Sequence, residues 1–462
     1  MPLALKKMTN QWVLYLISLA FLMEVVDMTA LNTSLPVIAH DLSVQVLFLK
    51  HGLVSYLLSI AICLPLSPYL EGRMGCKPLF LWANTVFLIG SLGCATSHMA
   101  LTLFAFRALQ GIGAAFLSST ARLIMVRIYK KDQLYEAQIT AASVVSIGLF
   151  IGPLIGGAIS TWLSWRWIFL INVPVVFVSM MAVKLYLHLP RQSKYERRFS
   201  WAGFISLGLC LLSGLLCIEL ARDYHWSLVH QGVFFLFALM SGWVFLNNER
   251  KSHKPLFIQC IWSQFRVKQT LVGSFILRIA LMAEPFVLPI FLQKIIGISA
   301  LDSGLLLSIS ALGVFFSKRA LKWMRPRLGE VLICHIGLGC LIVLMLAYAY
   351  VLLHYHVYVL ALLLFMVGFA RGGVFTVINV SMYQSLTDAT QSTGTTLNSM
   401  IIQLGASMAV SVSAWVLSWH MNMLGGGLHA SGFSSVFILE AVFVAVAFLI
   451  FYRLNQRLKP SD

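Results

Sequence analysis

About fourteen apolar runs, each long enough to cross a lipid bilayer, constrain this chain more than any other feature. A membrane-spanning helix needs roughly 20 mainly apolar residues. Such runs begin near Trp12, Leu47, Leu79, Ala100, Ala137, Trp167, Trp201, Gly232, Thr270, Ser303, Val331, Val357, Thr395 and Ser434. Only 11% of the residues are charged, whereas soluble domains carry about 25%. The sequence therefore predicts an all-α polytopic membrane protein with about 14 transmembrane helices.

The basic residues give the orientation. The net charge of +17 comes from 33 lysines and arginines. If the N-terminus is cytoplasmic, only Lys50, Arg166, Arg222 and Lys294 fall outside, and three arginines fall within spans. The positive-inside rule explains this distribution, which argues against a nucleic-acid partner. The first run is too long and too acidic for a cleavable signal. We expect a multi-pass protein of the cell (inner) membrane with both termini cytoplasmic.

Two polar segments divide the apolar runs. RQSKYERRFSW (191–201) is the most polar stretch between spans six and seven, and HKPLFIQCIWSQFRVKQ (253–269) alternates bulky apolar with basic residues, as an interfacial helix does. Short similarities link the flanking parts: LME (22–24) with LMAE (281–284), and ALQGIGAAF (108–116) with FARGGVF (369–375). The pattern predicts an N-terminal six-helix bundle (1–190), a linker with accessory helices seven and eight (191–250), and a C-terminal six-helix bundle (251–462). Repeats of this kind are typical of secondary transporters.

Ionisable residues inside the spans are candidates for function, because each costs roughly 3 kcal/mol at the bilayer centre. They are Glu24, Asp27, Arg107, Arg278, Glu284, Arg371 and Glu440. Glu24 and Asp27 lie three residues apart and share a helix face. A desolvated pair does not readily hold two negative charges unless a cation lies close, so we expect at least one carboxylate to hold a proton. The alternative is that these groups form ion pairs that only hold helices together.

The fifth span contains a stripe of small residues. In SIGLFIGPLIGG (146–157), Gly148, Gly152 and Gly156 recur every four residues, and Gly157 follows. Such a stripe lets another helix approach closely. Pro153 removes a backbone donor within it and should bend the helix. The pattern predicts either a packing face or a gating element.

Six segments in order resemble the major facilitator superfamily, and within it the fourteen-span drug:proton antiporter family. DMTALNTSLP (27–36), RALQGIGAA (107–115) and the Gly-Pro stripe are similar to its first-, fourth- and fifth-span motifs. The other three segments are WRWIFLINVP (165–174), LPIFLQKIIGISALDSGLL (288–306) and STGTTLNSMIIQLGAS (392–407). The resemblance implies two six-helix bundles plus two accessory helices, and proton-driven export of amphipathic small molecules.

The resemblance also implies roles for residues. Asp27 would carry the coupling proton, with Glu24 as the next candidate, and Arg107 would tune it. Asn32 and Gln110 of the motifs would line the substrate cavity, and Thr29 and Pro36 complete the first-span signature. Arg278, Glu284 and Arg371, the ionisable residues of the C-terminal spans, are added to the expected cavity lining as a departure from the family. Gly148, Gly152, Pro153, Gly156 and Gly157 would seal or hinge one side.

The chain departs from the family at three places. The loop SPYLEGRMGCKP keeps Arg73, Gly75 and Lys77 of the cytoplasmic loop motif, but Gly72 stands at its aspartate position, which leaves open whether Glu71 substitutes. The equivalent loop of the second half, SKRALKWMRPRLGE, is too degenerate to identify. Ile402 stands where the family often has arginine. The extra charges at 278, 284 and 371 suggest a differently charged C-terminal cavity wall.

No motif points to an enzyme. The chain has no G-x-x-x-x-G-K-[ST] phosphate loop and no metal-ligand spacing of His, Cys or Glu, so we expect no cofactor and no metal. The expected partners are a small-molecule substrate, protons and the bilayer; whether a periplasmic adaptor takes part is open. Two alternatives remain: a major facilitator transporter for one specific solute, such as a siderophore or metabolite, and a non-transporting receptor.

Overall fold

The structure is a computed structural model of the chain. It describes residues 3–129, 131–187, 199–223, 228–251, 256–257, 265–354, 356–386 and 390–458. Within these ranges the regular elements are helices, and no strand is present. The prediction of an all-α fold is therefore confirmed.

The elements follow three groups along the chain. The first comprises α1 (Leu3–Asp41), η1 (Val46–Leu49), α2 (Lys50–Cys63), η2 (Leu64–Leu66), α3 (Ser67–Met74), α4 (Cys76–Ala95), α5 (Ala100–Ile128), α6 (Lys131–Trp162), α7 (Trp167–Leu170) and α8 (Asn172–Tyr186). The second comprises α9 (Trp201–Asp223) and α10 (Leu228–Lys251). The third comprises α12 (Phe265–Leu281), α13 (Glu284–Phe291), η3 (Leu292–Ile296), α14 (Ala300–His354), α15 (Val357–Gln384), α16 (Gln391–Met423) and α17 (Ala430–Leu458).

Thirteen helices in the described residues are long and apolar enough to cross a membrane. One of them, α14, has 55 residues, and a straight helix of that length would measure about 80 Å. It bends at Gly329 (φ 73°, ψ 160°), three residues after Pro326. The two arms of α14 therefore supply separate spans, in agreement with the predicted number of about fourteen.

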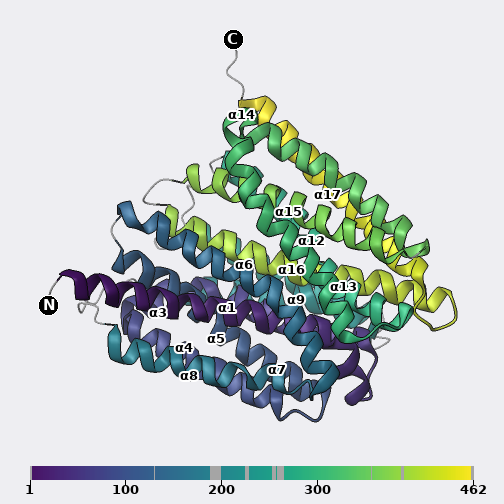
Figure 1. Cartoon of the computed structure of the whole chain (residues 1–462), viewed down its shortest axis with the longest axis horizontal. Coiled ribbons are helices and arrows are strands. Elements are labelled where there is room, and N and C mark those ends of the chain that lie inside the picture. Colours follow the sequence, from purple (N-terminus) through teal and green to yellow (C-terminus); the bar gives the residue numbers. More distant parts are fainter. Residues whose placement is uncertain are drawn as a thin grey trace.

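The first and third groups form two bundles, here called the N-terminal bundle (α1–α8) and the C-terminal bundle (α12–α17). Within the N-terminal bundle α4 packs on α5, α1 on α6 and α2 on α5; within the C-terminal bundle α14 packs on α15 and α17, and α12 on α17. Figure 1 shows the two bundles side by side, with the N-terminal bundle below. The helix pairs with the most contacts between them are α6 with α14, α2 with α16, and α1 with α13.

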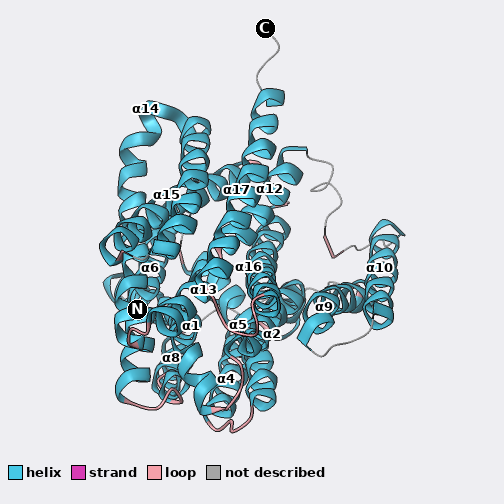
Figure 2. Cartoon of the chain, turned by 90° about the vertical axis from the view of Figure 1, so that its right-hand side faces the viewer, coloured by secondary structure: helices cyan, strands magenta, loops and turns pink. Residues whose placement is uncertain are grey.

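The accessory helices α9 and α10 lie at the edge of the molecule. They pack mainly on each other, and α9 touches α2 and α16. Figure 2 shows the pair projecting to one side of both bundles. Large apolar side chains of α10, including Phe235, Leu236 and Trp243, are exposed, as expected for a surface that faces lipid. The predicted limits at residues 190 and 250 stay a prediction, and most of 191–201 and 253–269 lies outside the described residues.

Contacts between the bundles occur toward both ends of the molecule. Near the face where α1 begins and α17 ends, here called the terminal face, Arg122 Nη1 on α5 donates to Ser399 Oγ on α16 (3.1 Å). Near the opposite face, Gln293 Nε2 donates to the Thr33 carbonyl on α1 (2.8 Å). The two bundles are therefore bonded to each other toward both faces in this conformation.

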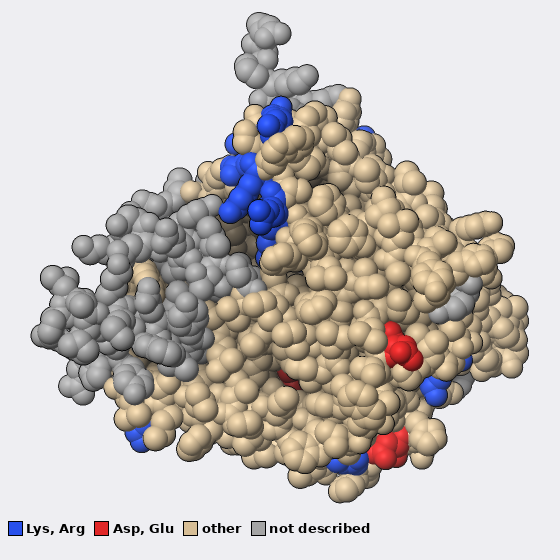
Figure 3. Space-filling model, viewed as in Figure 1, with Lys and Arg blue, Asp and Glu red and all other residues tan. Residues whose placement is uncertain are grey.

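Basic side chains gather at the terminal face. Around the bend of α14, Arg319, Lys322, Arg325 and Arg327 are exposed. Figure 3 shows lysine and arginine side chains grouped in the upper part of the view, near that bend. This distribution agrees with the expectation that the same face is cytoplasmic, which stays a prediction.

Candidate functional site

A buried ion pair lies at the centre of the N-terminal bundle. Arg107 Nη1 on α5 lies 2.5 Å from Asp27 Oδ2 on α1, and both side chains are fully buried. Charged groups at this depth persist only when they are paired and hydrogen-bonded. The two residues that the first-span and fourth-span motifs single out are thus direct partners.

Neutral side chains from α5 itself and from two further helices complete the network. Gln110 Nε2 donates to Asp27 Oδ1 (3.1 Å) and its Oε1 accepts from Arg107 (2.7 Å). Asn172 Nδ2 at the start of α8 also donates to Asp27 Oδ1 (2.9 Å). Ser91 Oγ on α4 accepts from both amides, at 2.8 and 3.4 Å. Every group that faces Asp27 in this network donates a hydrogen bond, so the network fits the ionised carboxylate.

The guanidinium of Arg107 is only partly satisfied. It lies over the Tyr56 ring at 4.2 Å and 5.8 Å from the Phe169 ring. Among the described residues its Nε and Nη2 have no hydrogen-bond partner. Unpaired buried donors are costly, so Arg107 has donors available for a group that enters beside it.

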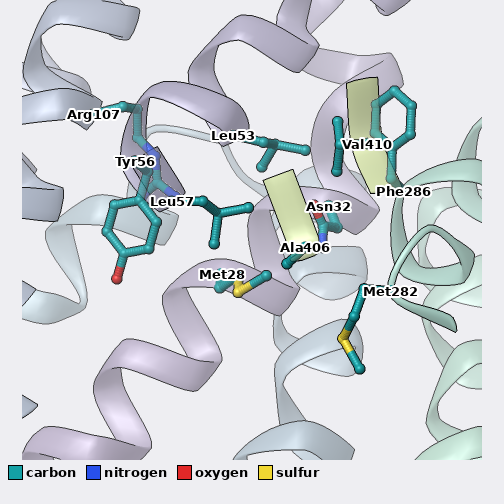
Figure 4. Close-up of a pocket in the computed structure, with 10 residues that line it drawn as sticks. All are labelled: Met28, Asn32, Leu53, Tyr56, Leu57, Arg107, Met282, Phe286, Ala406 and Val410. Carbon is teal, nitrogen blue, oxygen red and sulfur yellow. The ribbon is translucent and has the colours of Figure 1, made fainter. Parts of the chain in front are cut away.

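A small cavity lies next to this arginine, between the two bundles. It has a volume of about 10 Å³, roughly room for one water molecule. Its walls are Met28, Asn32, Leu53, Tyr56, Leu57, Arg107, Met282, Phe286, Ala406 and Val410. Figure 4 shows these side chains converging from both bundles. Asn32 is buried and its Oδ1 has no partner in the described part of the chain.

Of the predicted cavity residues, Asn32 lines this space and Gln110 belongs to the Asp27 network behind it. Arg278, Glu284 and Arg371 are not among its wall residues. Glu24, the alternative proton carrier, forms no hydrogen bond to the Asp27 network within the described residues. Its electrostatic partners are Arg122 first and Asp27 second. Glu24 and Asp27, which the sequence predicted to share a helix face, therefore interact mainly with different arginines.

The C-terminal bundle contains a second buried pair. Arg371 Nη1 on α15 lies 2.9 Å from Glu284 Oε2 on α13 and donates to the Leu281 carbonyl (3.2 Å). Its Nη2 donates to Ser310 Oγ on α14 (3.0 Å). The charges at 284 and 371 therefore compensate each other.

Arg278 differs, because the described residues contain no carboxylate bonded to it. It is 5% exposed, its Nε has no partner there, and its guanidinium lies 4.6 Å from the Phe375 ring. Aromatic contact partly offsets the cost of burying this cation.

The glycine stripe of α6 contacts two helices. A Cβ added at Gly148 would meet Leu22 Cδ1 at 3.0 Å, one at Gly152 would meet Thr29 Oγ1 at 1.8 Å, and one at Gly156 would meet the Ala30 carbonyl at 2.3 Å, so these three lie against α1. A Cβ at Gly157 would meet the Ala300 carbonyl of α14 at 2.5 Å. A Cβ added at Gly304 of α14 would likewise meet the Pro153 carbonyl oxygen of α6, at 2.3 Å. The stripe thus packs α6 on its own bundle and on the other bundle.

The segment of the predicted cytoplasmic loop motif folds as α3 and the start of α4, which meet at Gly75. Glu71 Oε1 pairs with Arg127 Nη2 at 2.5 Å, so an acid one residue earlier supplies an ion pair. Lys77 Nζ donates to the Lys184 and Leu187 carbonyls at the end of α8, both at 2.9 Å. Cations are favourable at helix C-termini. Gly75 ends α3 with φ 87° and ψ 159°, and Arg73 donates to the Tyr69 hydroxyl (3.2 Å).

Sequence reasoning missed three contributors to the Asp27 site: Ser91, Asn172 and Tyr56. Asn172 lies within the quoted segment WRWIFLINVP, so that segment held the signal. Isolated serines and tyrosines in apolar helices are common and give no such signal. Among the described residues no group of His, Cys, Asp or Glu could hold a metal ion.

Two helical bundles that enclose a buried acid–arginine network beside an inter-bundle cavity define a membrane transporter. The chain belongs to the Major Facilitator Superfamily, whose family model matches residues 17–410. It is 30% identical to a protein of Pectobacterium carotovorum subsp. carotovorum (strain PC1) provisionally named multidrug resistance protein MdtD, over 98% of this chain and 96% of that one. An Escherichia coli O127:H6 protein of the same name gives the same identity and coverage. A crystal structure of peptide transporter POT in complex with sulfate is similar in fold, with a TM-score of 0.71 and 16% identity, and the match covers 96% of this chain and 94% of that one.

Proposed function

We propose that this protein is a proton-coupled exporter of amphipathic small molecules, with Asp27 as the group that carries the coupling proton. The supporting observation is the position of Asp27: fully buried, paired with Arg107, and separated by that arginine from the cavity between the bundles. The relatives named multidrug resistance protein support the substrate class.

The geometry suggests how a proton and a cargo compete. When Asp27 is ionised, its charge cancels that of Arg107 and the cavity wall is close to neutral. When Asp27 takes up a proton, its ion pair with Arg107 is lost and a positive charge stands at the cavity wall. A cationic cargo is then repelled. Proton uptake therefore favours release of the cargo, and proton release favours its binding, which is the condition for exchange.

The bundles supply the conformational change. Hydrogen bonds join the bundles toward both faces, so separating the bundles at one face requires one bundle to rock against the other. The close glycine contact between α6 and α14 gives the two bundles a smooth surface for that movement. The membrane potential contributes about 2.3 kcal/mol per charge per 100 mV if a net charge crosses.

The test is accumulation of a panel of dyes, antibiotics and siderophores in efflux-deficient cells. Cells with the wild-type protein should accumulate less of at least one compound, and a protonophore should abolish the difference. Asp27→Asn at equal membrane levels should behave like cells without the protein. Asp27→Glu keeps a titratable acid and should retain part of the export with a changed pH profile.

Asp302→Asn is the matched control, because it makes the same chemical change at an exposed carboxylate that bonds to Ser299. It should export as the wild type does. Full export by Asp27→Asn would overturn the assignment and move it to Glu24, and no response to the protonophore would overturn proton coupling.

A second candidate function is transport of one anionic solute, and Arg278 is the observation that favours it. This cation is buried without a bonded carboxylate in the described residues, so an anionic group of a solute would compensate it. Arg278→Gln should then lower transport of a single carboxylate or siderophore in the panel. If Arg278→Gln exports every compound as the wild type does, the second candidate function is excluded and the first remains.

A further inference from the structure

Glu440 on α17 is a buried acid without a bonded partner. It is 3% exposed, and among the described residues neither carboxyl oxygen has a hydrogen bond. An ionised carboxylate in such a place lacks both water and donors, so burying it costs much more free energy than burying the neutral acid. The environment of Glu440 thus suits the protonated form.

The helix that carries Glu284, α13, packs against α17, the helix that carries Glu440. Glu284 on α13 and Arg371 on α15 both act electrostatically on Glu440. Arg371 is already bonded to Glu284, to the Leu281 carbonyl and to Ser310. Two carboxylates and one guanidinium are electrically neutral only when one carboxylate holds a proton. Glu284 has the arginine, so Glu440 holds the proton.

A tyrosine hydroxyl lies at the same place. Tyr348 on α14 is fully buried, and its hydroxyl has no partner within the described residues. Its ring stacks on Phe437 with centroids 4.8 Å apart, and Phe437 lies three residues before Glu440 on the same face of α17. Glu284, Arg371 and Glu440 all act electrostatically on this hydroxyl.

The other titratable groups on the packed helices are engaged elsewhere. Arg278 of α12 lies against Phe375. His420 of α16 shares a hydrogen bond with Ser435, more than one turn before Glu440. His335 of α14 contacts Phe448 and Tyr452, two turns or more after it.

We propose that Glu440, Glu284 and Arg371 form a second proton-binding site, located within the C-terminal bundle, in which the two carboxylates share one proton. The shared proton resides on Glu440 while Glu284 is paired with Arg371. In the exchange step the O–H bond of Glu440 breaks, an O–H bond forms on Glu284, and Arg371 changes partner to the new Glu440 carboxylate. The net charge of the cluster stays constant during this step. This site does not depend on Asp27 being the coupling group.

The experiment is infrared spectroscopy of the purified full-length protein in lipid nanodiscs, which detects the C=O stretch of protonated carboxyl groups. Glu440→Gln should remove a protonated-carboxyl band that the wild type shows at neutral pH. In Glu284→Gln, Glu440 is the carboxylate that remains beside Arg371. The proton affinity of Glu440, followed by the same band, should fall by roughly 10-fold or more. Size-exclusion elution shows that each variant is folded.

Glu249→Gln is the matched control, because Glu249 is buried but accepts two backbone N–H bonds, at 2.7 and 3.1 Å, as an ionised carboxylate does. It should leave the band unchanged. A band that persists in folded Glu440→Gln, or a proton affinity unchanged in Glu284→Gln, would overturn the proposal. Asp27→Asn should keep the band whatever its export activity, so failure of the Asp27 assignment and failure of this second site are distinguishable.

Discussion

The two bundles place a buried acid–arginine pair on corresponding helices and then surround it differently. In the N-terminal bundle the pair joins the first and fourth spans through Asp27 and Arg107. In the C-terminal bundle it joins the first and fourth spans through Glu284 and Arg371. The sixth span of the N-terminal bundle adds a neutral donor, Asn172, whereas the sixth span of the C-terminal bundle carries Glu440.

This difference changes what each pair can do. In the N-terminal bundle the carboxylate has a surplus of donors, and its arginine lines the inter-bundle cavity. A proton that binds to Asp27 therefore changes the net charge next to any molecule in the cavity. In the C-terminal bundle two carboxylates, Glu284 and Glu440, act on the one guanidinium of Arg371, and neither Glu284 nor Arg371 lines that cavity. One arrangement is suited to coupling with a cargo and the other to holding a proton.

Replacing the arginine of either pair should cause the largest loss of stability and tests whether the two bundles differ. Arg107→Gln and Arg371→Gln each leave a buried carboxylate without its cation, which costs about 3–5 kcal/mol of unfolding free energy at neutral pH. Asp27 keeps the amide donors of Gln110 and Asn172, so we expect the loss in Arg107→Gln to change less with pH than the loss in Arg371→Gln. Denaturant titration of the purified variants between mildly acidic and mildly alkaline pH measures both quantities.

For Arg371→Gln we expect the loss to shrink as the pH falls. Glu284 and Glu440 can then both be neutral, and the folded state binds more protons than the unfolded state. Stability therefore decreases as the pH rises. Equal pH dependence of the two variants would contradict the charge difference between the bundles. The double variant Arg371→Gln with Glu284→Gln should recover stability, because it removes both charges of the pair.

Much of the fold could be predicted because the bilayer imposes a local rule on the sequence. Apolar runs of about 20 residues mark spans without any knowledge of tertiary contacts. The acid–arginine pair of the first bundle could be predicted as a pair only through motifs, since Asp27 and Arg107 are far apart in the chain. No motif joined Glu284 with Arg371, so their pairing required the structure.

The repeat was also harder to detect in sequence than in structure. SKRALKWMRPRLGE was too degenerate to identify as the second copy of the loop after the second span. Gly329 nevertheless has nearly the same backbone angles as Gly75, φ 73° and ψ 160° against φ 87° and ψ 159°. In the sequence this shared conformation appears only as a single glycine. The charged residues around Gly329 differ from those of the motif, so the second copy could not be identified from the sequence.

Replacing these two glycines should sharpen the comparison with an intermediate effect. Their backbone conformation is essentially restricted to glycine, so Gly75→Ala and Gly329→Ala should each cost about 1–3 kcal/mol of unfolding free energy. Side-chain clashes do not contribute, because the nearest atom to an added Cβ is 3.8 Å away at Gly75, and nothing lies within 4 Å at Gly329. Gly339→Ala is the control, since this helical glycine is equally open and alanine favours helix. Thermal unfolding of Gly329→Ala that matches Gly339→Ala would show that the second loop is not a structural copy of the first.

The smallest expected effect concerns the ion pairs beside these glycines. Glu71 pairs with Arg127 between α3 and α5, and the two side chains are 17% and 21% exposed. Glu330 pairs with Arg325 within the bend of α14, and this arginine is 52% exposed. Partly exposed pairs contribute about 0.2–1 kcal/mol, so Glu71→Gln should lie near the upper limit and Glu330→Gln near the lower. High salt should reduce the contribution of the Glu330 pair further, because dissolved ions screen exposed charges more than buried ones. Denaturant titrations at low and high salt measure both effects. A larger loss of unfolding free energy in Glu330→Gln than in Glu71→Gln would contradict this order. It would mean that the exposed ion pair within the bend of α14 stabilises the protein more than the less exposed pair between α3 and α5.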